Sequence, residues 1–194
     1  MGKPMAENPS RLFKSKRDWS VWLKKNHRKH AGLWLRIAKK DSGMRSVTYQ
    51  EALEVALCYG WIDGQKRPED DKTWLQRFVP RSAKSIWSKI NREKAQALIK
   101  SGEMKAAGLE AIENAKKNSR WETAYSSQSK ATVPDDLQKA LDGSPKAKAF
   151  FETLNSVNRY AILFRTQNVK KAETRARKIQ RFVKMLERRE KIYP

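Results

Sequence analysis

The sequence holds one cysteine and two histidines in 194 residues, and it has no long uninterrupted run of apolar residues. Because Cys58 is the sole cysteine, an internal disulfide is excluded. His27 and His30 have no cysteine or clear acidic partner near them, so we interpret them as surface residues and expect no metal and no cofactor. The lack of about 20 consecutive apolar residues predicts that the chain does not span a membrane.

Motifs that mark common enzyme classes are also missing. There is no Gly-x-Ser-x-Gly pattern, no Walker-type phosphate loop and no dinucleotide-binding glycine pattern. Cys58 lies in an apolar segment, as inert buried cysteines usually do. We assign no catalytic residue and favour a protein that is not an enzyme. The first eleven residues lack the apolar stretch of a secretory signal, which together with the single cysteine predicts a cytoplasmic location.

Positive charge is what the sequence has in excess. Lysine and arginine number 43 against 21 aspartates and glutamates, which gives a net charge of +22. Such an excess favours encounters with polyanions, such as nucleic acid, anionic lipid or phosphorylated ligands. The alternative is a solvated surface whose charge has no specific partner. The charge predicts an anionic ligand or nucleic acid as partner, and it says nothing about oligomeric state.

Residue patterns predict an α+β protein that is mostly helical, with a small antiparallel sheet in the N-terminal half. Ser15 and Thr48 stand where helices are capped, and Gly60 stands where the second helix ends. Alternating residues predict strands over 33–37 and 73–79, and a further strand beginning at 61. We also predict a helix capped by Ser85, with Ile86, Ile90 and Ala97 on its packed face, and another over 104–116.

The second half reads as a helical bundle. We predict four regions in all: a flexible tail over 1–11, an α+β region over 12–117, a polar connector over 118–133 and a helical region over 134–194. The last helix is expected over 171–191, with a buried seam formed by Ala172, Ala176, Ile179, Val183 and Leu186. Its opposite face carries a basic stripe that is a candidate polyanion-binding surface: Arg177, Arg181, Lys184, Arg188 and Lys191.

The segment from Cys58 to Gln65 places Trp61 and Asp63 between two glycines, at a helix-to-strand corner. Asp63 is the best polar candidate, either as a turn-forming residue or as a ligand contact. If the neighbouring strands pair, indoles and guanidinium groups could gather there as an anion-binding or base-stacking pocket, or as an ordinary aromatic core. The candidate ligand-binding residues are Trp61, Asp63, Arg77, Arg81, Trp87 and Asn91.

Several segments together resemble the YdeI/OmpD-associated, bacteriocin-protection family. The N-terminal matches are Trp22–His27, Gly32–Leu35, Tyr49–Ala52, Cys58–Gly64, Gln76–Arg81, Trp87–Lys89 and Asn91. Those near the C-terminus are Pro145–Ala147, Asn158–Tyr160 and Glu173–Arg177. The resemblance implies a bacterial protein with a role in bacteriocin tolerance or envelope stress, and it brings no catalytic residues with it.

Three functional hypotheses remain open at this point. The first is a cytosolic, non-enzymatic protein of the bacteriocin-protection type that binds an anionic partner. The second is a nucleic-acid-binding protein that uses the basic C-terminal helix. The third is a small-ligand-binding protein or enzyme with a pocket at the corner of Trp61 and Asp63.

Overall fold

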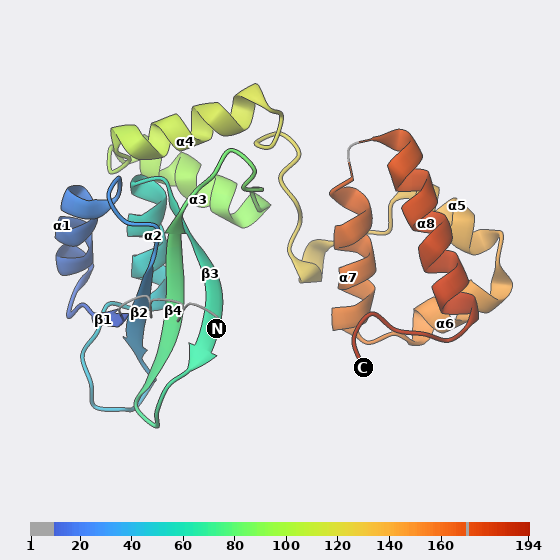
Figure 1. Ribbon diagram of the computed structural model, residues 1–194, viewed down its shortest axis with the longest axis horizontal. Coiled ribbons are helices and arrows are strands. Elements are labelled where there is room, and N and C mark those ends of the chain that lie inside the picture. Colours follow the sequence, from blue (N-terminus) through green and yellow to red (C-terminus); the bar gives the residue numbers. More distant parts are fainter. Residues whose placement is uncertain (1–9, 170) are drawn as a thin grey trace, which may run out of the picture. The chain divides into compact units, whose positions relative to one another are not determined.

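A computed structural model of the chain describes residues 10–169 and 171–194. Figure 1 shows helices throughout these residues and one small sheet near the N-terminus. The predicted α+β class, mostly helical, is confirmed. The chain forms two compact units: an N-terminal unit that includes the described residues through Trp87 and Asn91–Ala124, and a C-terminal unit of Ser88–Ile90 and Tyr125–Pro194. The division near residue 124 lies inside the segment assigned to a connector.

The sheet has four strands in the order β1-β2-β4-β3 among the described residues. They are β1 (Ser10–Leu12), β2 (Leu33–Ala38), β3 (Trp61–Pro68) and β4 (Thr73–Pro80). The pairs β2–β4 and β3–β4 are antiparallel, as predicted, but β1 pairs with β2 in parallel. The sheet is therefore mixed, and Ser10 and Arg11 belong to a strand. Residues 1–9 of the predicted flexible tail lie outside the described residues.

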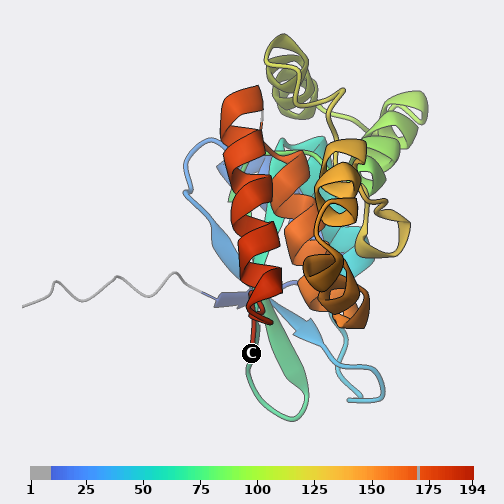
Figure 2. The same cartoon turned by 90° about the vertical axis from the view of Figure 1, so that its right-hand side faces the viewer.

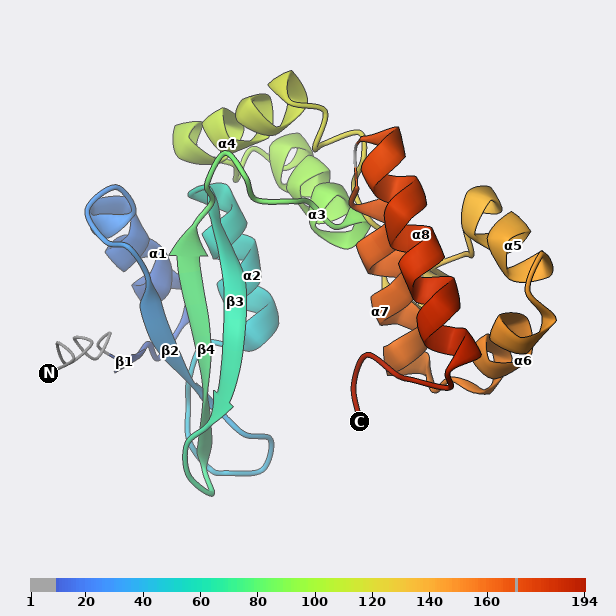
Figure 3. The ribbon, with the colours of Figure 1, turned by 45° about the vertical axis from the view of Figure 1, so that its right-hand side comes forward.

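Two helices cover the inner face of the sheet. They are α1 (Lys16–Asn26) and α2 (Tyr49–Cys58), and Figure 3 shows α2 behind the strands. Ser15 caps α1 and accepts a hydrogen bond from the Asp18 backbone, and Thr48 caps α2 in a complete capping box with Glu51. Their apolar residues pack against the sheet around Trp19, whose ring centroid lies 5.8 Å from that of Phe78.

Alternation along β4 decides which side chains face this core. Trp74, Gln76 and Phe78 are paired with Ile37, Leu35 and Leu33 of β2, as the predicted two-residue period requires. Gln76 is buried, and its Nε2 donates to the carbonyl oxygens of Gly64 and Gln65, at 3.1 Å each. These bonds hold the register shift that interrupts the pairing of β3 with β4.

Helix α3 (Lys89–Lys100), from Asn91 onward, and helix α4 (Ala106–Lys117) complete the N-terminal unit. The prediction that Ser85 caps the first of them was wrong. Ser85 instead accepts a hydrogen bond from the Ser82 backbone at 3.0 Å within a tight turn, and the helix begins four residues later. Ile86, Ile90 and Ala97 are exposed, and the helix buries Ala95 and Leu98 in their place.

The C-terminal unit is a helical bundle, as predicted (Figure 2). After a short 3-10 turn, η1 (Gln128–Lys130), it contains α5 (Asp135–Asp142), α6 (Pro145–Thr153), α7 (Ser156–Gln167) and α8 (Ala172–Glu187). Ser144 caps α6, with Pro145 at its first position. The core of this unit is formed by residues from all four helices: Leu137, Leu141, Ala147, Phe151, Leu154, Ile162, Leu163, Ile179, Phe182 and Leu186.

Helix α8 is shorter than predicted. Arg189 adopts the left-handed conformation, with φ of 57°, and its N–H bonds the Leu186 carbonyl at 2.9 Å, which ends the helix. Lys191 therefore lies beyond it. The buried seam is Ile179, Phe182 and Leu186, whereas Ala172 and Ala176 are exposed and Val183 is half-buried. The larger Phe182 fills the core position that the sequence pattern assigned to Val183.

Candidate functional site

The predicted corner after α2 is built on Gly60. Its φ of 71° is left-handed, and a β-carbon there would lie 2.7 Å from the carbonyl oxygen of Ala107. The residue that follows, Trp61, is buried, and its indole Nε1 donates to the His27 carbonyl at 3.0 Å. Trp61 also packs edge-on against Trp19, with ring centroids 6.2 Å apart. The ring is thus part of the aromatic core, and its only polar atom has a partner.

Asp63 and Arg77 do not converge, although their strands pair as expected. Asp63 is half-buried in β3, and its carboxylate accepts a hydrogen bond from the Tyr49 hydroxyl at 2.8 Å. Arg77 follows Gln76 in β4 and points to the outer face, where its guanidinium lies 6.0 Å from the ring centroid of Trp34. The two charged groups therefore occupy opposite faces of the sheet.

Arg81 and Trp87 do meet. The guanidinium carbon of Arg81 lies 3.5 Å from the ring centroid of Trp87, and Nη1 donates to the Ile86 carbonyl at 3.2 Å. They line a cavity of about 40 Å³ together with Asn114 and the turn at Ser82. This volume suits water or a small ion and is far below that of ordinary ligand pockets. Asn91 lies in the first turns of α3 and is half-buried.

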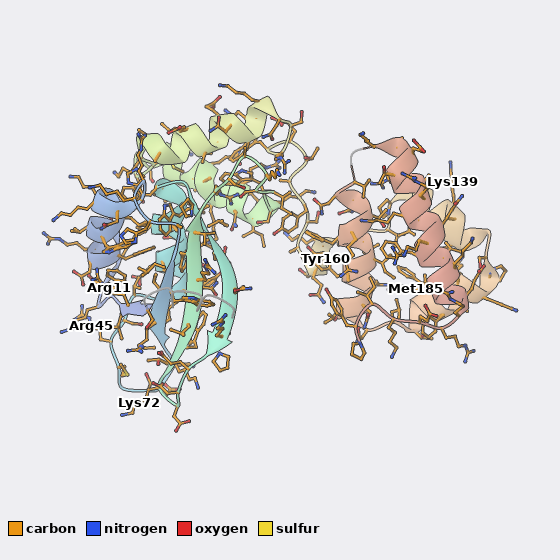
Figure 4. The ribbon with its side chains drawn as sticks, viewed as in Figure 1. Arg11, Arg45, Lys72, Lys139, Tyr160 and Met185 are labelled. Atoms are coloured by element: carbon orange, nitrogen blue, oxygen red, sulfur yellow. The ribbon has the colours of Figure 1, made fainter. Side chains whose placement is uncertain are left out.

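A larger site occurs in the C-terminal unit, where α7, α8 and the final residues form a groove of about 560 Å³. We call it the basic groove. Four of its lining residues are cationic, one is acidic and three are apolar: Arg165, Lys178, Arg181 and Arg188, then Glu190, then Phe182, Met185 and Ile192. Met185 is labelled on α8 in Figure 4.

Helix geometry explains how these residues come together. Lys178, Phe182 and Met185 follow one another at spacings of four and three, which places them along one side of α8. The buried Asn158 positions the chain end, because its Oδ1 accepts hydrogen bonds from the backbone N–H groups of Ile192 and Tyr193 at 3.1 and 2.9 Å. The groove is therefore bounded on one side by a helix and on another by a fixed tail.

The charges of the basic groove are mostly uncompensated. Arg188 is paired with Glu190, with Nε and Oε1 3.1 Å apart. No ion pair within residues 10–169 and 171–194 involves Arg165, Lys178 or Arg181. Arg165 donates a hydrogen bond to a neutral group, the Tyr193 hydroxyl, at 3.4 Å. Three cations thus face the groove without an acidic partner among the residues that the structure describes.

Another arginine of α8 has a structural role. Arg175 donates to both carboxylate oxygens of Asp136, and its Nη1 donates to the Thr166 carbonyl at 2.8 Å. The hydrogen bonds lower the pKa of Asp136 and raise the pKa of Arg175. Arg175 thereby ties α8 to α5 and α7, and its charge is already neutralised.

The predicted basic stripe coincides with the basic groove only in part. Arg181 and Arg188 line the groove, whereas Arg177 and Lys184 are exposed elsewhere on α8 and Lys191 lies beyond the helix. Sequence reasoning missed Arg165 and Lys178. Lys178 could have been found from its spacing to Arg181 and Met185, but Arg165 belongs to another helix and joins the site through tertiary packing.

The described residues offer little support for other kinds of site. No cluster of three or more metal-ligating His, Cys, Asp or Glu side chains occurs within them. None of the helices in residues 10–169 and 171–194 has the length and apolar character to cross a membrane.

Two family models match the chain. Residues 11–111 match a domain of unknown function, DUF8412. Residues 130–189 match the model described as bacteriocin-protection, YdeI or OmpD-associated, which confirms the resemblance predicted from the sequence for this part of the chain. No curated protein and no solved structure matched.

Proposed function

We propose that this chain, which belongs to the DUF8412 family (domain of unknown function), binds a polyanionic partner through the basic groove of its C-terminal unit. The observation that carries the proposal is the presence of Arg165, Lys178 and Arg181 in one groove of about 560 Å³, without an ion pair to any acidic residue in the described part of the chain. A groove with unpaired cations attracts anionic groups and repels cationic ones.

The distribution of charge in the C-terminal unit favours a polymer over a single small anion. Residues 165–194 contain eleven lysines and arginines against three acidic residues, whereas residues 125–164 contain five against four. The excess is therefore concentrated in the part of the chain that forms α8, the tail and the groove. Extended positive potential of this kind speeds the approach of a polyanion, and the groove then offers a defined place for part of it.

The apolar part of the groove strengthens this attraction. Phe182 is buried, Met185 and Ile192 are half-buried, and all three line the same space as the cations. Charges beside an apolar surface are less well screened by water, so an anion that enters gains more from each contact than it would on an open surface.

Nucleic acid is the polyanion that one further observation favours. Tyr193 is 45% exposed, and the guanidinium carbon of Arg165 lies 5.7 Å from its ring centroid. An exposed aromatic ring beside a cation can stack an unpaired base while the cation contacts the adjacent phosphate. We therefore propose single-stranded nucleic acid as the second, more specific form of the same function.

The cellular role is also part of the proposal. The description of the model matched by residues 130–189 supports a part in protection against bacteriocins. A bacterial, cytoplasmic and non-enzymatic setting is proposed with it. Unchanged bacteriocin sensitivity after deletion of the gene would count against that role. A pocket for chemistry at the corner of Trp61 has less support. A pocket of about 410 Å³ is lined there by Trp61 and Arg81, but Asp63 and Arg77 are not among its lining residues.

The test compares two double variants, each of which removes one lysine and one arginine from α8. Lys178→Gln with Arg181→Gln acts on the basic groove, and Arg177→Gln with Lys184→Gln is the matched control outside it. Binding of a fluorescein-labelled single-stranded oligonucleotide is followed by anisotropy, with heparin as competitor. We expect the groove pair to weaken binding about tenfold or more and the control pair about twofold.

Equal losses of oligonucleotide affinity in the two variants would mean that binding depends only on net charge. That result would contradict binding at the basic groove. Heparin separates the two forms of the proposal. If the groove binds any polyanion, heparin and unlabelled oligonucleotide should displace the labelled oligonucleotide at similar concentrations of charge. If the groove stacks bases, heparin should be the weaker competitor. Tyr193→Ala should then remove that preference and leave heparin binding unchanged.

A further inference from the structure

A second groove lies in the N-terminal unit, and it is independent of the proposed function. It has a volume of about 610 Å³ and is bounded by the loop over 39–48, which joins β2 to α2. Arg45, labelled in Figure 4, is on this loop. We infer that this groove, called here the loop groove, binds a small ligand that carries both a planar aromatic ring and an acidic group, of the nucleoside monophosphate class.

The aromatic wall of the loop groove is formed by Tyr49 and Trp74. Both are half-buried and line the groove, with ring centroids 6.1 Å apart. The Tyr49 hydroxyl is held by Asp63 at 2.8 Å, so the ring has a fixed position. Met44, 40% exposed, and Ile37 add apolar surface to the same space. A planar ligand ring could therefore be buried between groups that are already in place.

All the charged residues that line the loop groove are positively charged. Lys39, Lys40 and Arg45 line it and are exposed, and the lining contains no acidic residue. None of the ion pairs formed in the described part of the chain involves these three side chains. Lys66 adds a fourth positive charge nearby, with Nζ 4.3 Å from the ring centroid of Trp74. An acidic ligand group could pair with these cations, for which the described residues supply no ion pair.

The hydroxyl groups of the lining are already used by the protein. Ser46 Oγ accepts from the Ala38 backbone at 2.8 Å and donates to the Val47 carbonyl at 3.0 Å. Thr48 Oγ1 donates to the Glu51 carboxylate at 2.9 Å within the capping box. These bonds fix the base of the loop and leave the cations and rings as the groups that recognise a ligand.

Size and composition together favour a nucleoside monophosphate. A volume of about 610 Å³ is within the usual range for small-molecule sites. Free phosphate could contact only the cations of the loop groove, and a nucleoside could stack only on its aromatic rings. Only a ligand with both parts, such as a base and a phosphate joined by a sugar, engages both sets of groups at once.

Isothermal titration calorimetry on the full chain tests this inference with AMP, GMP, CMP and UMP, and with adenosine and inorganic phosphate. We expect at least one monophosphate to bind with a Kd below about 1 mM, and about tenfold more tightly than its nucleoside or phosphate alone. Lack of binding by all four monophosphates, or equal affinity for phosphate, would overturn the inference.

Variants locate the binding site. Lys39→Gln, Lys40→Gln and Arg45→Gln together should weaken monophosphate binding about tenfold, because they remove the unpaired cations. The matched control is Lys24→Gln, Lys25→Gln and Arg17→Gln, three exposed cations on α1. Equal weakening by the two triple variants would overturn the inference. The pair Lys178→Gln and Arg181→Gln should leave monophosphate binding unchanged, which separates this site from the basic groove.

Discussion

A β-carbon on Gly108 would lie 2.5 Å from the carbonyl oxygen of Cys58 and 2.7 Å from that of Leu57. Helix α4 therefore crosses the C-terminal end of α2 at a point where only a glycine fits. Gly60, at the end of α2, faces the same helix, because a β-carbon there would lie 2.7 Å from the Ala107 carbonyl oxygen. The two glycines fix how closely these helices approach and so support the corner that begins β3.

This close approach reverses the usual effect of alanine in a helix. Replacing a glycine inside a helix by alanine usually gains up to about 1 kcal/mol of stability. Gly108→Ala should instead lower the free energy of unfolding by about 1–2 kcal/mol, because the added methyl group cannot be accommodated without moving α4. Urea denaturation followed by tryptophan fluorescence measures this change in the N-terminal unit, which contains all seven tryptophans.

The control for this experiment is Gly64→Ala. A β-carbon on Gly64 would have its nearest contact at 3.8 Å, the Arg77 carbonyl oxygen, which is an ordinary separation. Its stability should stay within about 0.5 kcal/mol of the parent chain. If Gly108→Ala proves more stable than the parent, the close contact between α4 and α2 is not as described.

Glu69 should make the N-terminal unit sensitive to acid. Its carboxylate accepts two hydrogen bonds from Arg36 Nε, at 2.9 and 2.8 Å, and one from Thr73 Oγ1 at 2.7 Å. The Arg36 hydrogen bonds lower its pKa from the ordinary value of 4.5. Because folding lowers this pKa, the stabilising contribution is present above about pH 4.5 and is lost as the pH falls through the lower folded-state value.

Glu69→Gln should therefore cost about 1 kcal/mol at pH 7, a figure kept small because Arg36 is 41% exposed. The difference from the parent chain should shrink as the pH is lowered from 6 to about 3. Asp71→Asn, at an exposed acid in the same loop, is the control and should show neither effect. A penalty that stays constant with pH would argue against the ion pair as its source.

Cys58 should be chemically inert in the folded chain. The residue is 6% exposed, and burial raises the pKa of its thiol to about 11. At pH 8 only about one thiol in a thousand is then ionised, and the thiolate is the reactive form. Ellman's reagent should react at least about 100-fold more slowly with the native chain than with glutathione, and at the glutathione rate in urea. Rapid reaction without denaturant would show that α2 opens locally.

Local signals predicted the elements that depend on neighbouring residues. The capping box of Thr48 with Glu51 and the left-handed Gly60 mark the ends of α2, and alternation identified the inner face of β4. These features need only a few adjacent residues. Strand β1 was missed because its three residues carry no period of their own and are ordered by pairing with β2.

Tertiary contacts decided what the sequence could not predict. The sequence around Ser85 is typical of a helix cap, yet Ser85 stabilises a turn with Ser82. Helix α3 begins only beyond Trp87, whose ring centroid lies 4.8 Å from that of Trp121. The candidate sites show the same division. The basic character of α8 was readable, but the contribution of Arg165 depends on the packing of α7 beside α8. Arg189 ended α8 early, in a conformation that residues other than glycine seldom adopt.

The salt dependence of oligonucleotide binding tests the proposed basic groove most directly. Each phosphate contact to a single strand contributes a slope of about −0.7 to a plot of log K against log salt concentration. Lys178→Gln with Arg181→Gln should make the slope shallower by about 1.4, while Arg177→Gln with Lys184→Gln leaves it close to that of the parent chain. Identical slopes for the two variants, or binding that does not change with salt, would contradict the proposal.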